Sequence, residues 1–151
     1  MRVLFLVQKE QRAILDRLYE GIAAHCECET RWLTSAEQRN LRGYFRREVD
    51  VTQYDRIVFF LRFKHEIRQV GFIRSVPNLV ILEHDAYQNY IPCKYTGEFS
   101  AYYRKLPWAR VICSGFMVSE RLRAEGFDAV FVPKGYDQSL LQGEDRERDI
   151  E

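Results

Sequence analysis

Short runs of apolar residues recur along the chain, and each has the length of a buried β-strand. These runs consist almost wholly of Val, Ile, Leu, Phe and Ala, as expected for strands that are covered on both faces of a parallel sheet. The segment 27–33 mixes polar with apolar residues and predicts an amphipathic strand. The pattern thus predicts six strands, at 3–7, 27–33, 57–61, 79–82, 111–113 and 129–132.

Segments with the spacing of an α-helix separate these strands. One is predicted between the first two strands, and another after Thr34, which can cap it, with Leu41, Tyr44 and Phe45 facing inward. Gly126 is expected to end the helix that precedes the last strand. Strands that alternate with helices predict an α/β fold, a Rossmann-like three-layer domain with a mostly parallel sheet of about six strands.

The composition fits one globular domain and argues against several classes of protein. The chain has 151 residues, of which 46% are hydrophobic, enough to form a core. Its 23 Lys and Arg residues against 22 Asp and Glu give a net charge of +1, so we expect no nucleic-acid partner. The N-terminal apolar run, 3–7, is too short for a signal peptide or a membrane span, and we expect a cytoplasmic protein.

The motifs of common α/β chemistries do not occur in the sequence. There is no G-x-G-x-x-G for a dinucleotide, no phosphate-binding P-loop and no G-x-S-x-G nucleophile elbow. Leu61 and Arg62 end the third strand where a phospho-receiver domain needs acidic residues. Cys26 and Cys28 have no second matching pair, so we expect no metal and interpret the four cysteines as small buried side chains.

The fourth strand ends in the most reactive group of residues, Glu83-His84-Asp85. In open α/β sheets, ligands bind at the carboxyl ends of the strands. A His beside carboxylates can be oriented by one of them and can bond to a substrate oxygen. The alternative is that His84 is merely solvated in a polar loop.

Aromatic residues are concentrated between His84 and Trp108. Such rings can stack on a sugar while a polar group at their edge forms hydrogen bonds. We expect Tyr87 and Tyr90 to line a cleft. We expect other rings to pack the local helix against the sheet, namely Phe99, Tyr103 and Trp108.

Four arginines in the second helical region fall at the spacing of one helix face. They are either an ordinary solvated face or a patch for anionic lipid head groups and peripheral membrane contact. The four are Arg39, Arg42, Arg46 and Arg47.

The last third of the chain carries a more specific pattern. The strand 111–113 leads through Ser114 into a helix with the x-x-E-x-L pattern at 118–122, and V-P-K-G-Y-D follows at 132–137. This order resembles the end of the N-terminal domain of GT-B glycosyltransferases, above all the large retaining family four, where the turn reads V-P-N-G-V-D. The element order agrees over most of the chain, and the motifs agree over 109–141.

The resemblance implies that this chain is the acceptor-binding half of a glycosyltransferase, which transfers a sugar from a nucleotide-sugar to a glycan or glycolipid acceptor. His84 matches a family histidine that faces the donor–acceptor cleft, and Asp85 is expected to support it. The favoured interpretation places Gln8, Lys9, Tyr87 and Tyr90 nearby as substrate-binding residues. The family often has a glycine-rich loop after the first strand, where this chain has Gln8-Lys9-Glu10.

The same interpretation divides the chain into 1–141, the Rossmann-like acceptor-side domain, and 142–151, a linker or the start of a donor-binding domain. Its turn toward that domain contains Lys134, Gly135 and Asp137. We expect no cofactor in this domain and no sugar transfer without the second one. A different class of protein fits the length as well: a complete, non-catalytic flavodoxin-like binding or regulatory module.

Overall fold

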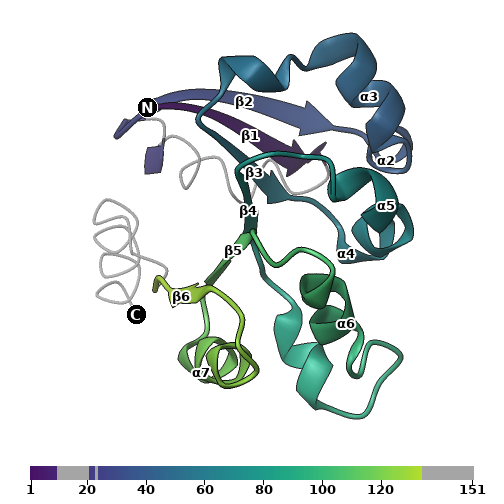
Figure 1. Cartoon of the computed structure of the whole chain (residues 1–151), viewed down its shortest axis with the longest axis vertical. Coiled ribbons are helices and arrows are strands. Elements are labelled where there is room, and N and C mark those ends of the chain that lie inside the picture. Colours follow the sequence, from purple (N-terminus) through teal and green to yellow (C-terminus); the bar gives the residue numbers. More distant parts are fainter. Residues whose placement is uncertain (10–20, 23, 134–151) are drawn as a thin grey trace, which may run out of the picture.

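A computed structural model describes residues 1–9, 21–22 and 24–133. In this part of the chain six strands form one sheet, and every neighbouring pair is parallel, in the order β2-β1-β3-β4-β5-β6 (Figure 1). The predicted α/β class, a Rossmann-like three-layer domain with a parallel sheet, is confirmed. The strands are β1 (Arg2–Gln8), β2 (Glu27–Leu33), β3 (Arg56–Phe60), β4 (Leu79–Leu82), β5 (Arg110–Cys113) and β6 (Ala129–Phe131).

Helices fill each described connection from β2 onward, as parallel strands require. The predicted helix between β1 and β2 lies largely outside the described residues. None of the helices described has the length and apolar character that a bilayer crossing requires. The α-helices are α2 (Ser35–Gln38), α3 (Leu41–Glu48), α4 (Phe63–Glu66), α5 (Val70–Ile73), α6 (Glu98–Arg104) and α7 (Phe116–Ala124), with 3₁₀ turns η2 (Val51–Gln53), η3 (Ile67–Gln69) and η4 (Ala86–Tyr90).

Alternate side chains of the central strands enter two separate hydrophobic clusters, one on each face of the sheet. In β1, Leu4 and Leu6 point into the larger cluster, which also takes residues from α3, α5, α6 and α7. Val3, Phe5 and Val7 point into the smaller one, against which Ile22 and Trp32 pack. The continuous apolar run in β1 therefore reflects burial on both faces.

The helical region after β2 is two helices rather than the single one that the arginine spacing implies. Thr34 caps α2 through a reciprocal pair of bonds with Glu37. The chain then turns at Arg39 and Asn40, whose side chain caps α3. The four arginines are exposed, but Arg39 does not share one helix with the other three, which lie on α3.

Gly126 ends α7 as predicted, with a left-handed φ of 94° and with Phe127 N–H bonded to the Leu122 carbonyl. The predicted core positions of Phe99 and Tyr103 are confirmed, since each is 3% exposed. The prediction for Trp108 is wrong, because it lies in the turn between α6 and β5 and is 45% exposed, while Leu106 and Ala109 are buried there.

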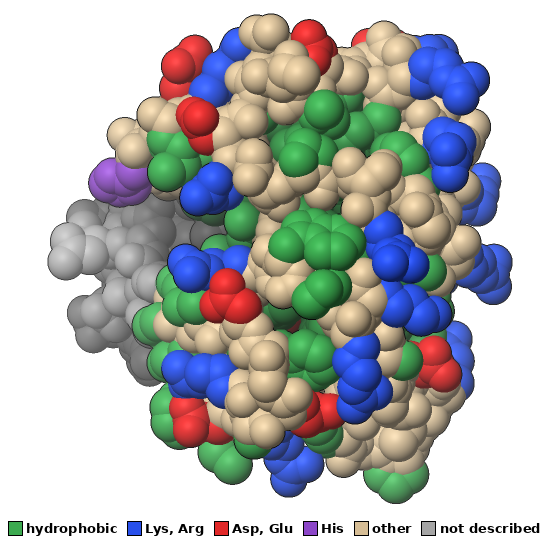
Figure 2. Space-filling view, viewed as in Figure 1, with side chains coloured by type: hydrophobic (Ala, Val, Ile, Leu, Met, Phe, Trp, Pro, Cys, Tyr) green, Lys and Arg blue, Asp and Glu red, His purple; other side chains and the backbone are tan. Residues whose placement is uncertain are grey.

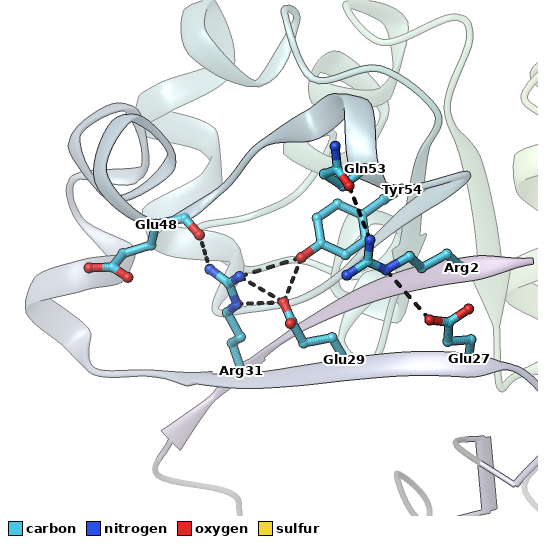
Figure 3. A network of polar contacts seen from close by, with 7 residues as sticks. All are labelled: Arg2, Glu27, Glu29, Arg31, Glu48, Gln53 and Tyr54. Carbon is cyan, nitrogen blue, oxygen red and sulfur yellow. Dashed lines mark hydrogen bonds and ion pairs between the residues drawn. The ribbon is translucent and has the colours of Figure 1, made fainter.

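A polar network holds the edge strand β2 against the segment after α3 (Figure 3). The Tyr54 hydroxyl donates to Glu29 Oε2 at 2.6 Å, and Arg31 pairs with the same carboxylate at 2.7 Å. Arg31 also donates to the Glu48 carbonyl. These contacts lower the pKa of Glu29. The network therefore joins β2 to Tyr54, which follows η2, and to the end of α3.

Truncation of the central strand tests this account of the core. Leu4→Ala removes a side chain with no exposed surface from β1, so we expect a loss of about 2–5 kcal/mol in the free energy of unfolding. Met117→Ala, at a side chain that is 66% exposed, is the control and should change the free energy by less than about 0.5 kcal/mol. Urea unfolding measures both, and equal losses would contradict the assigned core.

Candidate functional site

A cavity of about 280 Å³ opens at the carboxyl ends of β1, β3 and β4. β1 and β3 are neighbours at the point where the strand order reverses, the usual ligand site of an open α/β sheet. Ten residues line the cavity: Gln8, Arg62, Phe63, Lys64, His84, Asp85, Gln88, Lys94, Tyr95 and Phe99. Gln8, His84 and Asp85, which the sequence singled out from different strand ends, are thus brought together.

His84 is held through both ring nitrogens. Nδ1 lies 3.3 Å from Asp85 Oδ2, and Nε2 lies 3.3 Å from the Leu61 carbonyl oxygen. The Phe60 ring packs edge-on against the imidazole, with centroids 4.8 Å apart. Both polar neighbours are acceptors, so a neutral ring can donate to only one of them. A ligand that bonds to His84 therefore competes with a long contact to a main-chain carbonyl.

Gln8 is the buried polar residue of the cavity wall. Its side chain is 1% exposed, yet its Nε2 has no hydrogen-bond partner among the described residues. A buried amide donor without an acceptor costs free energy, and native proteins keep few of them. Gln8 therefore holds, in the cavity wall, an amide donor whose hydrogen bond the described residues leave unmade.

Three cationic residues of the cavity were not predicted. Arg62 and Lys64 come directly after β3, and Lys94 comes from the loop after η4. The Arg62 backbone is fixed from outside the cavity, because its N–H donates to Oε1 of the buried Gln38 at 3.1 Å. The position of Arg62 at a strand end was a usable signal, whereas Lys94 lies too far along the chain from any strand for such an argument.

An aromatic wall borders the same cavity. Phe63 and Phe99 stack face to face, with centroids 3.6 Å apart, and Tyr95 packs edge-on against Phe63 at 5.4 Å. The aromatic loop thus contributes to the cavity, as expected, but through Tyr95 and Phe99 rather than through the tyrosines chosen from the sequence. Tyr95 is partly exposed and can meet a ligand.

The remaining predicted residues lie elsewhere. Tyr87 is 53% exposed and outside the cavity lining, as is the exposed Lys9. The Tyr90 hydroxyl donates to Glu125 Oε2 at 2.5 Å, and Arg121 lies over its ring, so Tyr90 ties η4 to α7. Burial and the Glu125 carboxylate raise the pKa of Tyr90 to about 12. The predicted turn residues Lys134, Gly135 and Asp137 and the segment 142–151 lie outside the described residues.

Two buried carboxyl groups, Glu66 and Glu83, line a void of about 10 Å³ that shares His84, Asp85 and Phe99 with the cavity. Glu83 Oε2 accepts from the Ala86 N–H at 2.9 Å and so fixes the turn that presents His84 and Asp85. Burial raises its pKa. Glu66 is 4% exposed and its Oε1 has no partner in the described part of the chain. Burial raises the pKa of Glu66 to about 8, so this carboxyl is protonated at neutral pH.

Among the described residues, no three His, Cys, Asp or Glu side chains gather closely enough to hold a metal ion. Cys113 is buried and Cys26 and Cys28 are partly buried, as expected of small apolar side chains, whereas Cys93 is exposed.

No family model, curated protein or solved structure matches the chain.

The buried state of Glu66 makes stability depend on pH. The folded protein holds this proton up to about pH 8, whereas an unfolded chain releases it near pH 4.5. The Glu66 contribution to stability is therefore complete below about pH 4.5 and is lost as the pH rises toward 8, by about 1.4 kcal/mol per pH unit.

Glu66→Gln should remove that loss, because the amide stays neutral. We expect chemical unfolding to show the variant gaining on the wild type from pH 5 to pH 8. Glu48→Gln, at an exposed side chain, is the matched control and should follow the wild type. An unchanged pH profile in Glu66→Gln would show that the carboxyl is ionised in the folded state.

Proposed function

We propose that this chain is the acceptor-binding half of a glycosyltransferase, and that a donor-binding domain completes its cleft. The observation that carries the proposal is the cavity at the ends of β1, β3 and β4, where His84, Asp85 and the buried Gln8 meet an aromatic wall. This is the place where the motif resemblance puts an acceptor, and the edge that open α/β sheets use for ligands.

The lining groups suit a hydroxylated ligand. Amides of Gln8 and Gln88 donate to and accept from hydroxyl groups, and the Tyr95 ring gives a sugar face an apolar surface. His84 orients the acceptor hydroxyl once that hydroxyl displaces the 3.3 Å contact to the Leu61 carbonyl. Asp85 fixes the imidazole through Nδ1.

A second candidate is a non-catalytic flavodoxin-like binding module. The strand order favours it, because 2-1-3-4-5 is the flavodoxin-like order and β6 extends it by one strand. Such a module binds a flavin phosphate at the same switch point. The two candidates therefore share a site and differ in the ligand that it takes.

Titration of the purified chain with oligosaccharides and, separately, with flavin mononucleotide tests both candidates. For the acceptor-binding domain we expect oligosaccharide binding that His84→Ala weakens about tenfold, since it removes a polar contact to the ligand. Tyr87→Ala, at an exposed ring outside the cavity, is the control and should leave the Kd unchanged. Flavin binding without oligosaccharide binding would favour the module.

The same preparation should not transfer sugar from a nucleotide-sugar, because the groups that bind most of the donor belong to the second domain. Release of nucleotide from a nucleotide-sugar is the assay. Turnover by the 151-residue chain alone would contradict the proposal that acceptor and donor bind to two different domains.

We also propose a peripheral contact with anionic membranes through α3. Arg42 and Arg46 border a groove of about 300 Å³ whose walls include Phe45 and Phe72, and Arg42 lies 5.5 Å from the Phe72 centroid. Figure 2 shows a band of Lys and Arg side chains along the right-hand edge of the molecule, which runs from α3 past α5. Such a surface attracts anionic head groups at about 1 kcal/mol per basic residue.

Vesicle sedimentation checks this contact. Phosphatidylserine vesicles should bind the chain more tightly than phosphatidylcholine vesicles, and a double change, Arg42→Ala with Arg46→Ala, should weaken the binding about tenfold or more. If the double variant binds phosphatidylserine vesicles as tightly as the wild type does, α3 does not form the membrane contact.

A further inference from the structure

We propose that the cavity at the ends of β1, β3 and β4 takes a phosphate ester, whose charge is held by Arg62, Lys64 and Lys94. The inference rests on the proposed function in treating this cavity as the acceptor site, and it adds the chemical class of the acceptor. Two independent observations carry it. Among the described residues, the cavity lining has an excess of positive charge without carboxylate partners, and it contains a buried donor without an acceptor.

The cavity lining carries an excess of positive charge. Arg62, Lys64 and Lys94 stand against one carboxylate, Asp85, which already faces His84 Nδ1. In the described part of the chain, no carboxylate forms an ion pair with any of these three cations.

Some exposed arginines elsewhere on the molecule pair with carboxylates, although those of α3 do not in the described part of the chain. Examples are the pairs Arg104–Glu125 and Arg110–Asp128, each at 3.2 Å. Among the described residues, the three cations thus gather around the cavity without a carboxylate partner, and Lys94 Nζ lies 5.1 Å from the centroid of the Tyr95 ring. An anion that binds there meets three cations and breaks no described ion pair.

Gln8 supplies the second observation. Its Nε2 is buried in the wall of the same cavity and has no acceptor among the described residues. A phosphate group carries several acceptor oxygens, so it can take this N–H bond and charge-assisted bonds from Arg62 and Lys94 at once. A neutral hydroxyl satisfies the amide but leaves the cations unpaired.

The size of the cavity limits the ligand. Pockets for small molecules usually measure about 300–1,000 Å³, so about 280 Å³ is room for a phosphate group with one sugar ring. The stacked Phe63 and Phe99 and the edge-on Tyr95 offer that ring an apolar wall. The phosphate ester belongs either to a soluble sugar phosphate or to the head group of a lipid acceptor, and both share this chemistry.

Calorimetric titration of the full chain with glucose 1-phosphate, glucose and inorganic phosphate tests the inference. We expect glucose 1-phosphate to bind at least about tenfold more tightly than glucose, because charge-assisted hydrogen bonds distinguish the two. Arg62→Gln and Lys94→Gln should each weaken the phosphate ester about tenfold and leave glucose unchanged.

Arg74→Gln is the matched control, since Arg74 is exposed and lies outside the cavity lining. Thermal unfolding of each variant confirms that it is folded. The inference is overturned if glucose 1-phosphate binds no more tightly than glucose, or if Arg74→Gln weakens it as much as Arg62→Gln does.

Competition with vesicles identifies the source of the phosphate. Phosphatidylcholine vesicles that contain phosphatidic acid should displace glucose 1-phosphate if the natural ligand is a lipid head group. Lys94→Gln should weaken this displacement, and Lys105→Gln, at an exposed lysine outside the cavity lining, should not. Without displacement, a soluble sugar phosphate is the ligand. The phosphate chemistry itself is decided by the calorimetric comparison of glucose 1-phosphate with glucose.

The outcomes also separate this inference from the proposed function. Oligosaccharide binding that depends on His84 but shows no preference for phosphate overturns the inference and leaves the acceptor role intact. Phosphate-ester binding through Arg62 and Lys94 with no oligosaccharide binding supports the inference and counts against that role.

Discussion

Parallel pairing of β1 with β3 and of β3 with β4 brings the ends of three strands to one edge of the sheet. The register joins Val7 to Phe60 and Phe59 to Ile81, so the residues that follow each strand emerge side by side. The strands are apolar on both faces because both faces are covered, and their polar neighbours in sequence begin where the strands end. The cavity is a consequence of this arrangement, since Gln8, Arg62 and His84 come from three adjacent strand ends.

The environment around the cavity separates charges by depth. Glu66 lines the adjoining void, where burial keeps the carboxyl protonated at neutral pH, with a pKa of about 8. Arg62, Lys64 and Lys94 lie at its exposed rim. The buried acid therefore does not cancel the positive charge of the rim. Asp85 lies nearer the surface, but its position beside His84 commits it to orienting the imidazole.

Much of the fold could be predicted from the sequence, because a strand buried on both faces must be apolar throughout. Five strands lie where the apolar runs placed them, and β2 lies where the mixed pattern of 27–33 placed it. Gly126 ends α7 because a glycine tolerates the left-handed φ that this helix end requires. The break at Arg39 and Asn40 was not predicted, since helical spacing continues across it and Asn40 acts as a cap only when the chain turns there. Trp108 was misplaced because a large ring beside the short α6 can either pack or lie in a turn, and only tertiary structure decides.

The candidate site was predictable in part for the same reason. Gln8, His84 and Asp85 follow strands directly, so the topology alone unites them. Lys94 and Tyr95 reach the cavity through a long irregular loop, whose path no local pattern fixes. The Tyr90 hydroxyl could serve either a ligand or the protein itself, and its partner in the structure, Glu125, is remote in the sequence.

The proposed ligand of this cavity is bound through the buried amide of Gln8. Nuclear magnetic resonance of the Gln8 side-chain amide during titration with glucose 1-phosphate tests this contact most directly. Binding in the cavity should give a saturable shift of the Gln8 side-chain amide signals and of the His84 ring signals. The signals of the arginines of α3 should change little. Saturable binding that leaves the Gln8 amide unmoved and shifts the arginines of α3 would contradict this binding mode.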